Sequence, residues 1–168
     1  RRIIPYLEIT GSDLITGEET PYKQTDTLEL ARFYESAGAD EIMIFERGEL
    51  SDRNDKMLQL LDKLAGEIFL PLTLAGGIDS ISKIKQFLRA GASKVCINTA
   101  ALKSPEFLQD AADKIGPENI SLFFYFRQNT EGFKVYSKIA KTPYPTMLEW
   151  AKFAEDYVTE IIVQKVTE

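Results

Sequence analysis

The 168-residue chain contains no histidine and only one cysteine, Cys96. Without a second thiol it cannot form an internal disulfide, and without histidine it cannot build the mixed cysteine and histidine sites that commonly hold zinc. The lack of histidine also excludes a Ser-His-Asp triad within the chain. We therefore expect no metal and no cofactor. Any catalysis must rely on carboxylates, lysine, arginine, backbone amides or a partner.

The sequence also lacks long apolar runs and basic stripes. Its longest apolar run, residues 122–126, is far shorter than the roughly 20 residues of a membrane-spanning helix. The first residues, Arg-Arg-Ile-Ile-Pro, lack the hydrophobic region and cleavage site of a signal peptide. The 20 basic residues are outnumbered by 26 acidic ones and form no cluster, which argues against nucleic acid. These absences predict a cytoplasmic protein that binds neither membranes nor nucleic acid.

Short β-rich segments alternate with longer segments of helical periodicity, which is typical of parallel βαβ units. The expected strands cover residues 3–9, 41–46, 70–74, 94–98, 120–126 and 160–166. The expected helices cover residues 26–37, 57–64, 80–90, 104–115 and 146–157. A polar loop is expected over residues 10–25, and an irregular stretch over 128–145 with a small hairpin around Glu131 and Gly132.

Six strands and five helices give an α/β arrangement written (βα)5β6. It fits either an open doubly wound sheet or a TIM-type (βα)8 barrel that the chain supplies only in part. A full barrel usually takes about 250 residues. A last strand that ends near Glu168 with no covering helix favours the barrel, because parallel strands need cover on both faces. We expect residues 1–168 to form one barrel domain whose C-terminal units are missing.

Two segments at strand ends are candidates for phosphate binding. Gly76 and Gly77 follow the third expected strand and precede a helix. Paired glycines allow a close backbone approach, and the free N–H groups of a helix start attract anions. A tight turn that needs positive φ would require the same residues, so both interpretations stay open. Asn98 and Thr99 end the next strand, where α/β proteins bind ligands, although Thr99 also suits an ordinary turn.

Carboxylates at the same strand ends are candidates for acid–base chemistry. Glu8 ends the first expected strand, where a carboxylate at the mouth of a barrel could act as general acid or base. The alternative is an ordinary charged residue at a strand exit. Glu46 ends the second strand and is a further candidate. Glu41 and Glu46 are an odd number of residues apart, so without a bulge they point to opposite faces.

Charged residues also begin four of the expected strands. They are Arg2, Glu41, Lys94 and Glu160. Together they could form a ring of paired charges that closes the bottom of a barrel. The alternative is four solvated residues at strand starts, and the sequence does not decide between the two.

Four motifs carry a family resemblance. They are Arg-Ile-Ile-Pro at residues 2–5, Gly-Gly-Ile at 76–78, Gly-Ala-Ser-Lys-Val at 91–95 and Ile-Asn-Thr-Ala-Ala at 97–101. In this order they resemble the cyclase subunit of imidazole glycerol phosphate synthase, one of the phosphate-binding (βα)8 barrels of histidine biosynthesis. The last motif is the most specific. Family members are longer than this chain, so the resemblance implies that strands seven and eight and a second phosphate site are absent.

The resemblance implies a reaction and a partner. Ammonia from a glutaminase subunit crosses the barrel and attacks a phosphorylated substrate, a bisphosphorylated ribulosyl aminoimidazole intermediate. The products are imidazole glycerol phosphate and an aminoimidazole carboxamide ribotide. The positions that match one phosphate site are Gly76, Gly77, Asn98 and Thr99. The positions that match the charged gate on the partner-facing side are Arg2, Glu41, Lys94 and Glu160.

The catalytic positions depart from the family pattern, which has aspartates on strands one and five. Glu8 occupies the first position, and the second falls at Tyr125 or Phe126, neither of which is a carboxylate. Thr16 stands where the family usually has a lysine. Loss of one acid–base group typically costs about 10²- to 10⁴-fold in rate. Two hypotheses follow: a cyclase that acts through Glu8, or an altered relative that delivers ammonia to another acceptor or is a non-catalytic scaffold or fragment.

Overall fold

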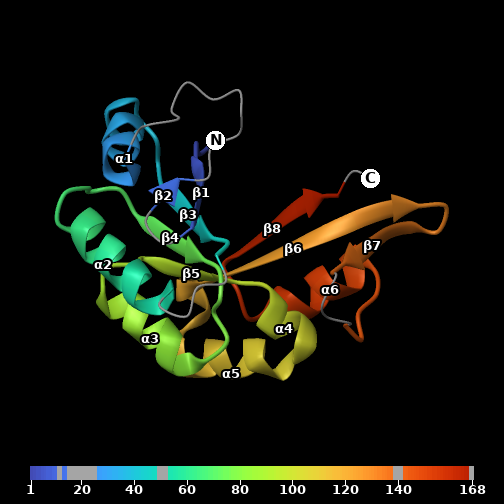
Figure 1. The fold of residues 1–168 in the computed structure, drawn as a ribbon. Coiled ribbons are helices and arrows are strands. Elements are labelled where there is room, and N and C mark those ends of the chain that lie inside the picture. The colour runs from blue at the N-terminus through green and yellow to red at the C-terminus, as the bar shows by residue number, and fades with distance from the viewer. Residues whose placement is uncertain (11–12, 15–25, 49–52, 138–141, 167–168) are drawn as a thin grey trace. The chain divides into compact units, whose positions relative to one another are not determined.

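A computed structural model describes residues 1–10, 13–14, 26–48, 53–137 and 142–166 (Figure 1). The chain divides into two compact units. Unit 1 comprises residues 1–77 and 82–95, and unit 2 comprises residues 78–81 and 96–168. Thr16 and most of the loop expected at 10–25 lie outside the described residues. Among the helices that the structure describes, none is long and apolar enough to cross a membrane.

Unit 1 is built on parallel strands joined by helices. Its strands are β1 (Tyr6–Thr10), β2 (Asp13–Leu14), β3 (Ile42–Glu46) and β4 (Leu72–Ala75). Strand β3 pairs in parallel with both β1 and β4, whereas the short β2 pairs antiparallel with β1. The helices are α1 (Thr27–Ser36), α2 (Arg53–Ala65) and α3 (Ile81–Arg89). Each expected strand and helix of this region is therefore confirmed to within a few residues, and β2 is an addition.

The first helix shows how local sequence sets the element boundaries. Asp26 precedes α1 in an extended conformation, and its carboxylate accepts a hydrogen bond from the Leu28 N–H. This cap satisfies a donor that the first helical turn cannot pair. At the other end Gly38 adopts a φ of +84°, which turns the chain toward β3. The helix predicted over residues 26–37 is thus confirmed at both ends.

The two faces of the unit 1 sheet differ. One face carries apolar side chains from β1, β3 and β4 that are almost fully buried: Leu7, Ile9, Ile42, Ile44, Leu72 and Leu74. On the other face Glu8 lies opposite Phe45, and Met43 lies opposite Thr73. Because successive side chains of a strand alternate between faces, Tyr6, Glu8, Phe45 and Thr73 share this second face.

Strand β5 (Lys94–Ile97) contains the boundary between the units, and unit 2 follows it. Its helices are α4 (Thr99–Lys103), α5 (Glu106–Ile115) and α6 (Met147–Ala154), with a 3₁₀ turn, η1 (Pro117–Asn119), after α5. Its strands are β6 (Ile120–Asn129), β7 (Gly132–Tyr136) and β8 (Glu160–Lys165). Strand β6 pairs in parallel with β8 and antiparallel with β7. The predicted hairpin around Glu131 and Gly132 is confirmed.

Unit 2 also corrects two boundaries. The expected strand over 120–126 continues to Asn129, because its second half pairs with β7. The helix expected over 104–115 is preceded by α4, which the sequence analysis did not predict. Helix α5 begins at Glu106, and the Ser104 hydroxyl donates to the Glu106 carboxylate at 2.8 Å. The alternative of an ordinary turn at Thr99 is therefore wrong, because residues 99–103 are helical.

Helix α6 connects the parallel strands β6 and β8. Thr146 and Glu149 form a capping box at its start, each side chain bonding the other's backbone N–H. Trp150 is fully buried and stacks on Phe153 at a ring separation of 5.5 Å. Tyr144 also stacks on Phe153, at 4.7 Å. A cap and an aromatic cluster therefore fix this helix, which completes a βαβ unit with β6 and β8.

Candidate functional site

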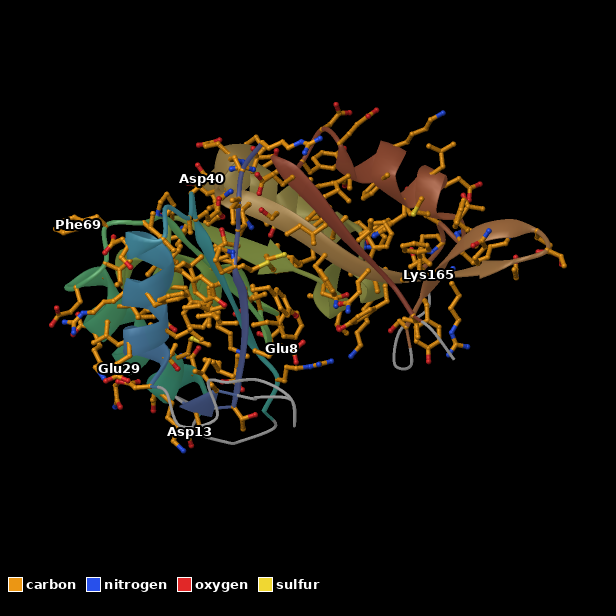
Figure 2. All side chains as sticks on the ribbon, turned by 90° about the horizontal axis from the view of Figure 1, so that it is seen from above. Glu8, Asp13, Glu29, Asp40, Phe69 and Lys165 are labelled. Carbon is orange, nitrogen blue, oxygen red and sulfur yellow. The ribbon has the colours of Figure 1, made fainter. Side chains whose placement is uncertain are left out.

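Glu8 and Arg47 form an ion pair between two neighbouring parallel strands, beside the carboxyl end of β3. Glu8 lies in β1, and Arg47 directly follows β3. Arg47 Nη1 donates to both carboxylate oxygens of Glu8, at 3.0 Å and 2.9 Å. Glu8 keeps 26% of its side chain exposed and Arg47 keeps 44%. Figure 2 shows Glu8 toward one end of the unit 1 strands and Asp40 toward the other.

Arg47 was not among the residues predicted from the sequence. The available signal was its place immediately after a predicted strand, where α/β proteins position ligand-binding side chains. Its guanidinium lies over the ring of Phe45, with the Cζ atom 5.7 Å from the ring centroid. Phe45 in turn contacts Tyr6 at a ring separation of 5.7 Å. Phe45 therefore packs against the guanidinium of the ion pair, and Tyr6 packs against Phe45, all on the same face of the sheet.

Glu46 does not join Glu8. In the register of β1 and β3, Glu46 lies opposite Ile9, which is fully buried on the apolar face. Glu46 is itself only 2% exposed, and its carboxylate accepts a hydrogen bond from the Gly48 N–H. It therefore organises the turn after β3 on the face opposite Glu8. The odd separation of Glu41 and Glu46 predicted that these two side chains point to opposite faces, and the contact of Glu41 with Thr73, on the face that carries Glu8, agrees with it.

The paired glycines follow β4 and both adopt positive φ, +107° at Gly76 and +63° at Gly77. A Cβ atom on Gly76 would overlap the backbone carbonyl oxygen of Glu46. The carbonyl of Gly77 accepts a hydrogen bond from Lys83 Nζ at 3.1 Å. The positive φ values agree with the turn interpretation, and Gly76 has a packing requirement in addition. The phosphate role of the pair stays a prediction.

Three of the four expected gate residues meet around a buried carboxylate. Glu41 is 3% exposed and lies just before β3. One of its oxygens, Oε2, accepts from Lys94 Nζ at 3.1 Å and from Arg2 Nη1 at 3.3 Å. The hydroxyl of Thr73 donates to the other oxygen, a contact that the sequence analysis missed. Since Lys94 keeps only 13% of its side chain exposed, neither it nor Glu41 is a solvated residue at a strand start.

The remaining predicted residues belong to unit 2. Glu160 begins β8 opposite Ser121 of β6. Asn98 precedes α4 but makes no side-chain capping bond, and Thr99 is the first residue of that helix. The phosphate cradle that combines these two residues with Gly76 and Gly77 draws on both units and stays a prediction.

Tyr125 and Phe126 both lie in β6, so their side chains point to opposite faces of that strand. Tyr125 packs edge-on against Phe123 with ring centroids 4.9 Å apart. Phe126 packs against Phe133 of β7 at 5.7 Å. Each position is thus occupied by an aromatic side chain in ordinary packing contacts, and neither is a carboxylate.

Comparison with known proteins gives the same family as the motifs. Imidazole glycerol phosphate synthase subunit HisF of Methanosarcina acetivorans is 37% identical over 155 residues, covering 89% of this chain and 54% of that protein. The subunit of Methanosarcina mazei is 38% identical over 136 residues, 77% of this chain and 50% of that protein. The subunit of an Exiguobacterium species is 34% identical over 155 residues, covering 90% of this chain and 61% of that protein.

The chain thus spans about half to three fifths of the length of these relatives. Residues 2–168 match the protein family described as histidine biosynthesis protein. This match extends over both units and over every site residue discussed above. The chain therefore belongs to the histidine biosynthesis protein family of (βα)8 barrels.

Proposed function

We propose that the chain acts as a cyclase of the imidazole glycerol phosphate synthase type. It takes ammonia from a glutaminase subunit and a bisphosphorylated ribulosyl aminoimidazole intermediate as substrate. The products are imidazole glycerol phosphate and an aminoimidazole carboxamide ribotide. Glu8 is the proposed acid–base residue, and Gly76, Gly77, Asn98 and Thr99 are the proposed phosphate-binding residues.

The buried cluster around Glu41 is the observation that carries this proposal. Its carboxylate contacts Lys94, Arg2 and Thr73, and it lies where the resemblance implies the partner-facing gate. Burying charges is expensive, and apolar residues of similar size often stabilise a protein as well or better. A charged cluster at the amino ends of the strands is therefore better explained by a role in passing or admitting ammonia than by stability alone.

The direction of the strands supports ammonia entry and chemistry at separate places on the same face. Thr73 and Glu8 share one face of the unit 1 sheet, and the Thr73 hydroxyl reaches Glu41. Glu41 precedes its strand, whereas Glu8 is the middle residue of β1 and its partner Arg47 directly follows β3. One face thus carries a charged cluster at the amino ends of the strands and the Glu8–Arg47 pair further along, beside the end of β3. Ammonia entry at the first and chemistry at the second fit the proposed reaction.

The second candidate is a catalytically altered relative that keeps the phosphate site and the glutaminase interface. One observation favours it. Aromatic residues fill the positions Tyr125 and Phe126, where the resemblance expects the second aspartate. Such a protein would deliver ammonia to a different acceptor or serve as a scaffold.

Two measurements on one sample separate the candidates. Isothermal titration with the bisphosphorylated intermediate tests binding, and an ammonium-dependent assay tests turnover. For a cyclase we expect both, with turnover reduced about 10²- to 10⁴-fold by Glu8→Ala. Glu67→Ala, which removes an exposed carboxylate paired with Arg32 and not with Glu8, is the matched control and should leave turnover unchanged.

The other outcomes are equally informative. Binding without turnover, together with retained stimulation of a partner glutaminase, would favour the altered relative. Turnover that survives Glu8→Ala would contradict the assignment of Glu8. No binding at all would contradict both candidates and leave the family and fold only.

A further inference from the structure

We propose that Arg47 is a positioning residue that holds the carboxylate of Glu8 in one orientation beside the carboxyl end of β3. The inference rests on the proposed cyclase function, in which Glu8 exchanges protons with the substrate. Arg47 is not offered as a replacement for the missing second carboxylate, because a guanidinium stays protonated in proteins. Its role is to fix where Glu8 points.

The contact geometry supports this role. A single nitrogen, Nη1 of Arg47, lies 3.0 Å from one oxygen of Glu8 and 2.9 Å from the other. A charged donor shared by both oxygens fixes the rotation of the carboxylate as well as its position. The pair joins adjacent parallel strands, so neither partner depends on a long loop for its placement.

Both partners are themselves anchored. The Arg47 N–H donates to the Ile9 carbonyl at 2.9 Å, which continues the β1–β3 ladder one residue beyond β3. The guanidinium lies over Phe45, within the distance at which cations and aromatic faces attract. Glu8 is held in β1 opposite Phe45. The backbone of each residue and the head group of Arg47 are therefore fixed independently of the ion pair.

Stability does not account for the pair. Arg47 keeps 44% of its side chain exposed and Glu8 keeps 26%, and ion pairs this open to water contribute little to folding. The Arg32–Glu67 pair is of that ordinary kind, since its side chains are 52% and 49% exposed. What distinguishes the Glu8–Arg47 pair is its place at the strand ends where barrels bind substrates.

The length of the Glu8 side chain explains why an ion pair that fixes its carboxylate would matter. Glutamate has one more rotatable bond than aspartate, so an unrestrained Glu8 would spread its carboxylate over several positions. Proton transfer needs the acid–base group within hydrogen-bond reach of the substrate atom. A misplacement of about 1 Å can cost about a hundredfold in rate. Arg47 removes that freedom by selecting one arrangement of the longer side chain.

A double-mutant cycle tests the inference. We expect Arg47→Met to lower kcat up to about a hundredfold while changing KM little. In a Glu8→Ala background the same change should have no further effect, because Arg47 then has no carboxylate to hold. Arg47→Lys should restore part of the loss. Arg32→Met, which breaks the exposed Arg32–Glu67 pair, is the matched control and should leave kcat unchanged.

Two kinetic results would overturn the inference. One is an Arg47→Met enzyme with wild-type kcat. The other is an equal loss of kcat in the Glu8→Ala background, which would mean that Arg47 acts on the substrate directly. A rise in KM with unchanged kcat would lead to the same conclusion.

A measurement that needs no turnover separates this inference from the proposed function. Side-chain ¹³C relaxation of Glu8, assigned by comparison with Glu8→Ala, reports how ordered the side chain is. We expect high order in the wild type and in Arg32→Met, and a clear drop in Arg47→Met. If the wild type has no cyclase turnover, the proposed function fails and this measurement alone decides the inference. Equal order in all three proteins would overturn it.

Discussion

Gly76 packs directly on the backbone of Glu46, joining the turn after β4 to the end of β3. Its φ of +107° lies in the region that only glycine adopts readily, and a Cβ atom would overlap the Glu46 carbonyl oxygen. Glu46 in turn fixes the turn after β3 through the Gly48 N–H. The ends of two neighbouring strands are therefore held together through backbone contacts, beside the Glu8–Arg47 pair.

This packing makes Gly76→Ala strongly destabilising. The methyl group would meet backbone atoms that cannot move independently, in addition to the strain of positive φ. We expect a loss of roughly 3 kcal/mol or more in the free energy of unfolding. Gly38→Ala is the matched control, since Gly38 has a φ of +84° but nothing within 4 Å of an added Cβ. It should lose only about 1–2 kcal/mol in urea unfolding, and equal losses would contradict the packing argument.

The fold was largely predictable because its signals are local. The cap at Asp26, the turn at Gly38 and the apolar strands each depend on a few neighbouring residues. Helix α4 was missed because it is only five residues long, too short to show helical periodicity. The extension of β6 was missed because its last residues are polar and become a strand only through pairing with β7.

The buried Glu41 cluster leads to a prediction about stability. Lys94→Met removes a largely buried partner and, among the described residues, leaves the buried Glu41 carboxylate with only the half-exposed Arg2 and the Thr73 hydroxyl, so we expect a loss of about 2–3 kcal/mol. Arg2→Met should cost less than about 1 kcal/mol, because half of that side chain is exposed. Adding Glu41→Gln to Lys94→Met should recover part of the loss. Urea unfolding measures all three, and a larger effect of Arg2→Met than of Lys94→Met would contradict the prediction.

Asp26 gives a prediction about pH. A hydrogen bond from Lys63 Nζ, 2.9 Å away, is the main cause that holds the pKa of Asp26 below its ordinary value. The charged form is therefore favoured in the folded state. Its contribution is fully present above the unfolded value of about 3.9 and is lost as the pH falls through the lower folded pKa.

The measurement compares the wild type with Asp26→Asn, which keeps a capping oxygen but no charge. The wild type should be more stable by about 0.5 kcal/mol above pH 4, and the difference should disappear in more acidic solution. Asp26→Ala should lose about 1 kcal/mol at neutral pH because the cap is removed as well. A difference between wild type and Asp26→Asn that grows on acidification would show the opposite sign and contradict the assignment.

Contacts in the site were predictable only for residues that occupy equivalent positions in neighbouring strands. A ring of paired charges at the strand starts was one of two interpretations, and Arg2, Glu41 and Lys94 do meet. Thr73 and Arg47 were missed because their roles depend on which strands become neighbours and in what register. Neither residue type is distinctive by itself, so the contacts become visible only when the strands are paired.

An aspartate placed at Tyr125 or Phe126 tests whether the lack of a second carboxylate limits the proposed reaction. Tyr125 and Phe126 are adjacent in an extended strand, so only one of them faces the side on which the reaction would occur. If the missing acid–base group limits turnover, only one of Tyr125→Asp and Phe126→Asp should raise ammonium-dependent kcat, by about tenfold to a hundredfold. The other should gain no activity, because its carboxylate would point away from the reacting side.

The asparagine variants at both positions are the controls. They match the shape of aspartate but cannot exchange a proton, so neither should raise kcat. A gain with Tyr125→Asp would place the reacting side of β6 with Phe123, and a gain with Phe126→Asp would place it with Phe124. A gain with both, or with an asparagine variant, would mean that relief of aromatic packing rather than proton transfer increases the rate. No gain with either would indicate that the chain has moved its second proton-transfer group elsewhere or has abandoned the cyclase reaction.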